Sequence, residues 1–256
     1  APPTIYRLMA QSDLSDGEFQ SIRHCFSAGE PLNPEAMRSW KNATGCDVYD
    51  GYGQTETINV IANFPGMPIK KGSMGKPCPG FEIDIIDNEA NILETDKIGN
   101  IGIKITNPYP PGLFKGYYKD KKRTSEVFRN GWYFTGDLGY FDEDGDLFVT
   151  GRVDDMIITG GENISPIEIE NILSLNKNIL EVTVVGLPDP KWGQKVCAFV
   201  VRNKNLNSQL LDEYCIKSNM LNFKRPKEYI FVKEIPKSPT GKILRRKLVA
   251  GEYELD

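Results

Sequence analysis

Residues 1–69 show two apolar stretches separated by an amphipathic one. The apolar runs at 22–27 and 46–50 each predict a buried strand. Between them, Pro34 at a first helical position and Gly45 at the end predict a helix. Strand, helix and strand at this spacing are typical of an α/β unit whose loops at the strand ends face a ligand.

Between residues 70 and 149 the chain changes to short apolar segments separated by glycine, proline, asparagine and aspartate. The segments at 81–86 and 101–105 are typical of this part, which is predicted to be rich in β-structure. The acidic stretch 142–146 resembles a calcium-binding loop, but the full ligand pattern ending in glutamate is missing. It therefore predicts a hairpin turn between two strands.

The last part of the chain alternates short helices and strands. Ser165 and Glu168 form a capping box with proline at the first helical position, which predicts a helix through Leu175. Further strands are expected at 180–187, 195–201 and 229–232, and a further helix at 210–220. This pattern is typical of a small α+β domain, which we expect to begin at Asp154.

The predicted fold class is therefore α/β followed by α+β. Residues 1–153 form the first domain, with an α/β unit at 1–69 and a β-rich subdomain at 70–153, and residues 154–256 form the second.

Composition and charge exclude few classes of protein. The chain has 256 residues, of which 39% are hydrophobic and 26% charged, and no apolar run is long enough to span a bilayer. A net charge of -4 and a pI near 5.3 argue against a general nucleic-acid binder. Five scattered cysteines without a CxxC pair favour a reducing cytoplasm. The single histidine, His24, lies between apolar neighbours and is interpreted as a packing residue rather than a catalytic base.

Several segments carry residues suited to nucleotide chemistry. The stretch 49–56 combines glycines, which let a backbone approach a ligand, with hydroxyl and carboxylate groups, and it is either a turn or a nucleotide-binding loop. Asp137 lies between glycines, where it either accepts ribose hydroxyl hydrogen bonds or caps a turn. Arg152 suits phosphate or hydroxyl groups as well as a surface ion pair. The basic segment 236–248 is by itself typical of a solvated face.

The order of these segments resembles one enzyme superfamily. Six stretches look like the successive core motifs of the acyl-CoA synthetase, luciferase and peptide-synthetase adenylation superfamily. They are SAGEPL (27–32), YDGYGQTE (49–56), YFTGDLG (133–139), GRVDDMI (151–157), GGENISPIEIE (160–170) and PKSPTGKILRRKL (236–248). The nearest resemblance is to the medium-chain or aromatic acyl-CoA synthetase branch. It implies that the first domain is the C-terminal portion of a large adenylate-forming domain, with a barrel-like subdomain, and that the second is mobile.

The resemblance also implies substrates and site residues. The family uses ATP, Mg²⁺ and coenzyme A to convert a carboxylic acid into its CoA thioester through an acyl-adenylate. The positions that match its ATP- and AMP-binding motifs are Gly29, Glu30, Pro31, Asp50, Gly51, Tyr52, Gly53, Gln54, Thr55, Asp137 and Arg152. By the same motifs Glu56 would hold magnesium, Lys242 would be the catalytic lysine, and Asp154 would be the hinge.

A further set of positions is implied for CoA. They are Gly160, Gly161, Trp192, Phe223, Arg225 and Lys227. The last four have alternatives that stay open. Trp192 could be a buried tryptophan, Phe223 a packed phenylalanine, and Arg225 with Lys227 a basic pair on the surface.

Two features depart from the family pattern. The Ser/Thr/Gly-rich phosphate loop that family members carry upstream of the SAGEPL segment is absent, so we expect the chain to be a fragment. Asn163 stands where acetate-type enzymes carry an arginine that meets CoA or phosphate, so the resemblance does not carry that contact over to this chain.

The resemblance also bears on the substrate. Gly53 stands where acetate-specific relatives carry tryptophan, which implies a deeper pocket for a medium-chain or aromatic acid.

Two other functions stay open at this point. An adenylation domain that loads a carrier protein would use the same motifs, although the segment 158–163 looks like the CoA ligases. A non-catalytic interaction module would have no acyl-AMP affinity. A homodimer is left open, and nucleic acid is not an expected partner.

Overall fold

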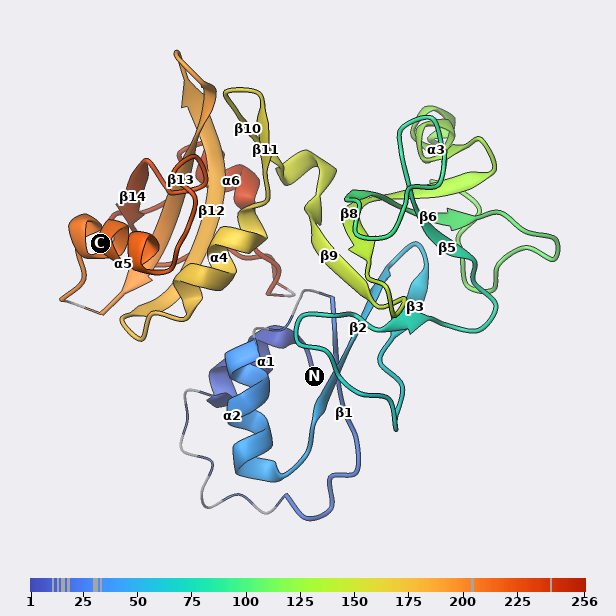
Figure 1. Cartoon of the computed structure of the whole chain (residues 1–256), viewed down its shortest axis with the longest axis horizontal. Coiled ribbons are helices and arrows are strands. Elements are labelled where there is room, and N and C mark those ends of the chain that lie inside the picture. Colours follow the sequence, from blue (N-terminus) through green and yellow to red (C-terminus); the bar gives the residue numbers. More distant parts are fainter. Residues whose placement is uncertain are drawn as a thin grey trace. The chain divides into compact units, whose positions relative to one another are not determined.

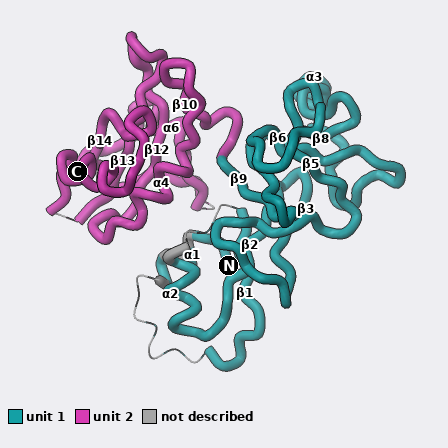
Figure 2. The backbone as a smooth tube through the Cα atoms, viewed as in Figure 1, with its two compact units in different colours: residues 1–150 teal, residues 151–256 magenta. Residues whose placement is uncertain are grey.

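The chain divides into two compact units, Ala1–Thr150 and Gly151–Asp256 (Figure 1; Figure 2). The computed structural model describes all residues except 11, 13, 15, 16, 18, 30, 31, 33, 204 and 240, and it leaves the side chains of residues 4, 7, 10, 34 and 35 undescribed. Both units contain helices packed on sheets, so the predicted class of α/β followed by α+β is confirmed.

The first sheet of the first unit contains the two strands of the predicted α/β unit. β1 (Cys25–Ala28) pairs in parallel with β2 (Val48–Gln54), and the strand order is β1-β2-β3-β4. The other elements are α1 (Pro3–Ala10), α2 (Pro34–Thr44), β3 (Ile58–Ala62) and β4 (Lys76–Pro77). Tyr6 of α1 and Trp40 of α2 are buried in one cluster with Val48, so both helices contribute to the core on this sheet.

The second sheet of this unit has the order β5-β6-β8-β7, with β9 paired to β8. Its elements are β5 (Ile83–Ile86), β6 (Gly99–Lys104), α3 (Lys121–Val127), β7 (Phe128–Arg129), β8 (Trp132–Phe141) and β9 (Leu147–Arg152). One core cluster contains Tyr52 and Ile61 of the first sheet together with Ile103 and Tyr133 of the second. This shared core brings β2 against β8, which matters for the site described below.

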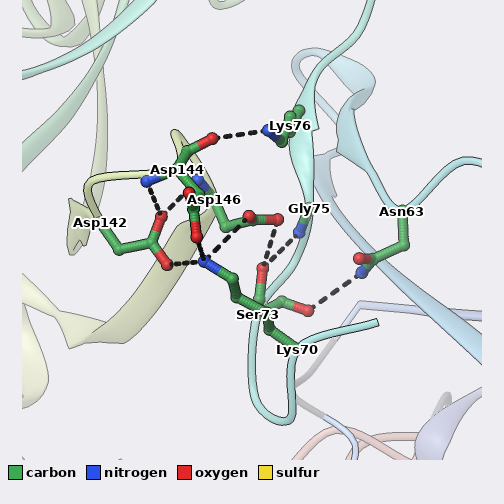
Figure 3. A network of polar contacts seen from close by, with 8 residues as sticks. All are labelled: Asn63, Lys70, Ser73, Gly75, Lys76, Asp142, Asp144 and Asp146. Atoms are coloured by element: carbon green, nitrogen blue, oxygen red, sulfur yellow. Dashed lines mark hydrogen bonds and ion pairs between the residues drawn. The ribbon is translucent and has the colours of Figure 1, made fainter. Parts of the chain in front are cut away.

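A lysine ammonium lies among the carboxylates of the acidic turn between β8 and β9. Lys70 Nζ lies 2.5 Å from Asp142 Oδ2 and from Asp144 Oδ2, and 3.5 Å from Asp146 Oδ2 (Figure 3). Asp142 Oδ1 accepts hydrogen bonds from the backbone N–H groups of Asp144 and Asp146, at 3.0 and 2.9 Å. Burial acts to raise the pKa of Asp142, but hydrogen bonds from Lys70 and the backbone outweigh it, so the pKa is lowered. The predicted hairpin turn is confirmed.

The second unit is a five-stranded sheet with helices on both faces. The order is β11-β10-β13-β12, with β14 paired to β13. Its elements are β10 (Ile157–Thr159), β11 (Glu162–Ile164), α4 (Pro166–Ser174), β12 (Ile179–Asp189), β13 (Gly193–Arg202), α5 (Ser208–Lys217), β14 (Glu228–Phe231) and α6 (Arg245–Val249). Val184 and Ala198 share a cluster with α4 and α5, whereas Val185 and Phe199 on the other face pack with Leu248 of α6.

The glycine-rich stretch at 51–54 is a strand, whereas the sequence predicted that the strand ended at Asp50. β3 pairs antiparallel with it, and two glycines permit close packing there. A Cβ on Gly51 would lie 2.5 Å from a ring carbon of Phe26, and a Cβ on Gly53 would lie 1.9 Å from the Ile58 carbonyl oxygen. A tryptophan at Gly53 would therefore disturb the backbone of β3 as well as any acyl pocket.

His24 is exposed, with its ring stacked on Tyr49 at a centroid distance of 4.6 Å. His24 therefore packs on Tyr49 at the surface rather than in the core, one residue before β1 begins at Cys25.

Candidate functional site

Two predicted nucleotide-binding loops begin at the same edge of the first sheet. The parallel register of β1 and β2 pairs Ser27 with Asp50 and Ala28 with Gly51, so the strands' carboxyl ends lie together. Gly29 follows β1 with φ of +103°, and a Cβ there would have no atom within 4 Å. Glu30 and Pro31 lie outside the described residues.

Asp50 is buried, and its carboxylate faces the backbone. Oδ2 accepts a hydrogen bond from the Leu32 N–H at 3.0 Å, and Oδ1 accepts one from the Gly51 N–H at 3.1 Å. Burial raises the pKa of Asp50 to about 7, although both backbone N–H groups act to lower it. In this structure Asp50 therefore connects the loop after β1 to β2.

The buried position of Asp50 predicts a loss of stability as pH rises. The folded chain keeps the proton up to about pH 7, while the unfolded chain releases it near the ordinary value of 3.8. The free energy of unfolding should therefore fall by roughly 1.4 kcal/mol per pH unit between these values and level off above them. Urea unfolding of wild type and of Asp50→Asn between pH 5 and 8 isolates this effect as the difference between the two proteins. A difference that is independent of pH would contradict it.

Asp137 on β8 is held by two residues of β2. The Tyr52 hydroxyl donates to Asp137 Oδ2 at 2.6 Å, and the Gln54 side-chain amide donates to the same oxygen. Tyr133 in turn donates its hydroxyl to Gln54 Oε1 at 2.9 Å. Burial, followed by the charge of Asp137, raises the pKa of Tyr52 well above its ordinary value. The structure thus brings three predicted nucleotide-binding residues into one hydrogen-bonded cluster, with the Tyr52 ring in the core.

Thr55 and Glu56 follow β2, and the segment before α3 holds Glu56. The Tyr117 hydroxyl donates to Glu56 Oε1 at 3.1 Å, and the Phe114 N–H donates to the Glu56 carbonyl at 2.8 Å. The Arg123 guanidinium lies 4.1 Å from the centroid of the Tyr117 ring. Tyr117 carried no signal in the sequence, since only the folded chain brings it to Glu56, which is 61 residues earlier.

The donor set around Glu56 suits a magnesium ion that takes its other ligands from phosphate and water. Thr55 is exposed and Glu56 is partly exposed, and both offer oxygen atoms. Within the described part of the chain, no three or more histidine, cysteine, aspartate or glutamate side chains are grouped to hold a metal ion by themselves.

In the second unit, Gly160 and Gly161 form the two-residue turn between β10 and β11. Their φ values of +58° and +87° favour glycine at both positions, as in a type I′ hairpin turn. The Gly160 N–H donates to the Trp192 carbonyl at 2.9 Å, and a Cβ on Gly160 would lie 3.0 Å from the Trp192 ring. Trp192 is 48% exposed, so the alternative of a buried tryptophan is wrong.

The other predicted CoA residues lie in the loop between α5 and β14. Phe223 is exposed, Arg225 pairs with Asp212 at 3.3 Å, and Lys227 Nζ donates to the Asn222 carbonyl at 3.1 Å. Arg225 also donates to Asn222 Oδ1 at 2.6 Å, so Asn222 joins the two basic side chains in one loop.

Lys242 is exposed at the end of a backbone turn. The Ser238 N–H donates to the Lys242 carbonyl at 2.8 Å, and the Lys242 N–H donates to Ser238 Oγ at 3.1 Å. Arg152 and Asp154 lie at the start of the same unit, where Val153–Asp155 forms a 3₁₀ turn after Arg152. Arg152 and Asp137, both predicted to bind the ribose, therefore belong to different units.

Comparison with known families assigns both units. The family model of the AMP-binding enzymes matches residues 1–118, and the model of the AMP-binding enzyme C-terminal domain matches residues 168–242. The chain belongs to the AMP-binding enzyme family. The adenylation superfamily indicated by the six sequence motifs is confirmed.

Relatives within the AMP-binding enzyme family align with nearly all of the chain. It is 42% identical over 258 residues to the mitochondrial acyl-coenzyme A synthetase ACSM3 of Homo sapiens, an alignment that covers 98% of this chain and 44% of the relative. The chain thus spans less than half the length of this curated relative.

Solved structures of AMP-binding enzymes superpose closely. ATP-bound MatB from Rhodopseudomonas palustris has a TM-score of 0.91 at 32% identity, covering 98% of this chain and 50% of that one. The anthranilate CoA ligase AuaEII in complex with anthranoyl-AMP has a TM-score of 0.87 at 34% identity, covering 98% and 49%.

Proposed function

We propose that this chain is part of an AMP-forming acyl-CoA synthetase that activates a medium-chain or aromatic carboxylic acid and transfers it to CoA. The observation that carries the proposal is the occurrence of the adenylation motifs in order across both units of an AMP-binding enzyme fold. ATP and anthranoyl-AMP in the similar structures support ATP and an acyl-adenylate as its ligands.

In the first half-reaction a substrate carboxylate oxygen attacks the α-phosphate of ATP, and pyrophosphate leaves. In our proposal the loop after β1 and the glycines of β2 surround the adenine. Asp137, held by Tyr52 and Gln54, accepts hydrogen bonds from the ribose hydroxyls, and Arg152 donates hydrogen bonds to the ribose oxygens. Lys242 supplies positive charge at the α-phosphate, where negative charge develops.

Glu56, held by Tyr117, would bind magnesium beside Thr55. The ion would offset the charge of the departing pyrophosphate.

In the second half-reaction the CoA thiol attacks the acyl carbonyl carbon, and AMP leaves. We propose that the second unit rotates about Asp154 between the steps, withdrawing Lys242 and presenting the Gly160–Gly161 turn as a wall of the pantetheine channel. Trp192 beside that turn, and the loop with Phe223, Arg225 and Lys227, would contact the CoA nucleotide.

The proposal is tested by acid-dependent ATP–pyrophosphate exchange on the intact protein. A panel of acetate, medium-chain acids and benzoates should show exchange with the longer or aromatic acids, followed by thioester formation with free CoA. Exchange that yields thioester only with a phosphopantetheine carrier would favour carrier loading, and absence of both exchange and nucleotide binding would favour an interaction module.

The 256-residue chain by itself should form no acyl-CoA. It spans 44% of its human relative, so most of the acyl pocket and the phosphate loop would be contributed by residues outside it. Thioester formation by the purified chain, measured by chromatography with the intact protein as the positive control, would refute this.

Asp137→Ala in the intact protein should weaken ATP binding by roughly 1 to 3 kcal/mol, the usual cost of losing a hydrogen bond to a charged group. Tyr52→Phe keeps the carboxylate but removes one of its donors, so its effect should be smaller. Calorimetric titration with ATP measures both variants. A nucleotide affinity equal to that of wild type would remove Asp137 from the site.

The compartment and assembly are also open to experiment. All five cysteines are free, which fits the proposed reducing compartment. The name of the human relative places that protein in mitochondria, so fluorescence imaging of the intact protein must decide between mitochondrion and cytoplasm. No helix among the described residues has the length and apolar character needed to cross a membrane.

Light scattering would test the proposed homodimer.

A further inference from the structure

Arg245 joins three parts of the second unit. It is the first residue of α6, and its Nη2 donates to both carboxylate oxygens of Glu170 on α4, at 2.7 and 2.8 Å. Its Nη1 lies 3.7 Å from Asp155 Oδ2, in the 3₁₀ turn that contains the proposed hinge residue. The side chains of Arg245, Glu170 and Asp155 are 20%, 15% and 30% exposed, so the contact with Glu170 is the more shielded one.

Glu170 is itself anchored to the core of the unit. Its Oε1 also accepts the backbone N–H of Val184 on β12 at 2.7 Å. Ile169, the residue before it on α4, is fully buried in the cluster that α4 forms with the sheet. The Arg245 guanidinium is therefore held against a rigid part of the unit, and removing one partner of such a shielded pair is costly.

The turn that carries Lys242 ends directly at Arg245. The Leu244 N–H donates to the Pro236 carbonyl at 2.8 Å, and Ile243 packs on the cluster with Phe199. Lys237 at the other end of the turn pairs with Glu181 on β12. These contacts shape the turn that carries Lys242. Arg245 follows the end of that turn and connects it, through Asp155, to the 3₁₀ turn at Val153–Asp155.

We propose that Arg245 is a positioning residue that holds the Lys242 turn in place relative to the hinge. Both of its partners, Glu170 and Asp155, belong to the second unit, so the guanidinium and the Lys242 turn would move together when that unit rotates. Lysine cannot replace it fully, because a point charge does not form the planar fork that reaches two carboxylates. The proposal rests on the proposed function, in which Lys242 acts in adenylation.

The first test measures the turn itself and is independent of activity. Hydrogen exchange of the backbone amides of Ser238, Gly241, Lys242 and Ile243 in the 256-residue chain should be at least ~10-fold faster in Arg245→Gln and intermediate in Arg245→Lys, since exchange reports local opening. Lys247→Gln is the matched control, because Lys247 lies on the same helix but pairs with an exposed Glu252 at 3.6 Å. Unchanged exchange in Arg245→Gln would overturn the proposal.

The second test separates the half-reactions in the intact protein. Arg245→Gln should slow acyl-adenylate formation by ~10²-fold, the order expected when a reacting group is misplaced by about 1 Å. The rate of thioester formation from supplied acyl-adenylate should change by less than about 3-fold, which is small beside the ~10²-fold slowing expected for adenylation. Arg245→Lys should recover part of the adenylation rate, and Asp155→Asn should slow adenylation without lowering the melting temperature.

A parallel fall of both half-reactions with the melting temperature would show an ordinary structural role and overturn the proposal. Failure of the wild-type intact protein to form acyl-adenylate would instead refute the proposed function. The exchange experiment alone would then decide whether Arg245 holds the turn.

Discussion

Lys242→Ala in the intact protein should slow acyl-adenylate formation by at least ~10²-fold, the order expected for removing one preorganised charge-stabilising donor. Lys242 is exposed on a turn of the second unit. In our proposal it reaches the α-phosphate only in the conformation used for adenylation. Thioester formation from supplied acyl-adenylate and CoA should therefore be nearly unaffected. Single-turnover measurements of the two half-reactions give both rates.

Lys233→Ala provides the control for a general loss of positive charge. Lys233 is an exposed lysine of the same unit, and it pairs with Glu254 at 3.1 Å. In Lys233→Ala the rates of both half-reactions should match those of the wild-type protein. If Lys242→Ala depresses the two steps equally, the alternation of the two units is wrong and the lysine is structural.

Gly161→Leu should have the opposite effect, slowing thioester formation on the order of 10²-fold, as expected for obstructed approach of a reacting group, while adenylation persists. Gly161 has φ of +87°, and a Cβ there would have no atom within 4 Å, so a larger side chain would extend into the space around the turn. In our proposal that space is the pantetheine channel. Single-turnover transfer from purified acyl-adenylate to CoA measures the effect.

Gly251→Leu controls for backbone strain at Gly161. Gly251 has φ of +79° and also has no atom within 4 Å of an added Cβ, so both variants should lose a similar ~1 to 2 kcal/mol of stability. Only Gly161→Leu should slow the thioester step. Equal slowing in the two variants would contradict a role for this turn in CoA access.

The sequence by itself determined several local elements and the family, although it did not predict α3 or the continuation of β2 to Gln54. The capping box at Ser165 and Glu168 predicted α4, and the Ser165 hydroxyl indeed accepts the Glu168 N–H at 3.4 Å. The acidic stretch at 142–146 predicted a hairpin turn, and the Asp142 N–H donates to the Asp146 carbonyl at 3.1 Å to close that turn. Such features depend on interactions between residues a few positions apart, which a single sequence displays directly. The motif order then predicted the family without any knowledge of contacts.

Only the tertiary structure decided which side chains meet. Tyr52 and Asp137 are 85 residues apart, Glu56 and Tyr117 are 61 apart, and Glu170 and Arg245 are 75 apart. The two glycines of β2 supported a nucleotide-binding prediction, yet both are also required by the close approach of Phe26 and β3. Contacts of this kind arise because sheets and helices pack around shared apolar cores, and the distance along the chain between two residues does not encode that packing.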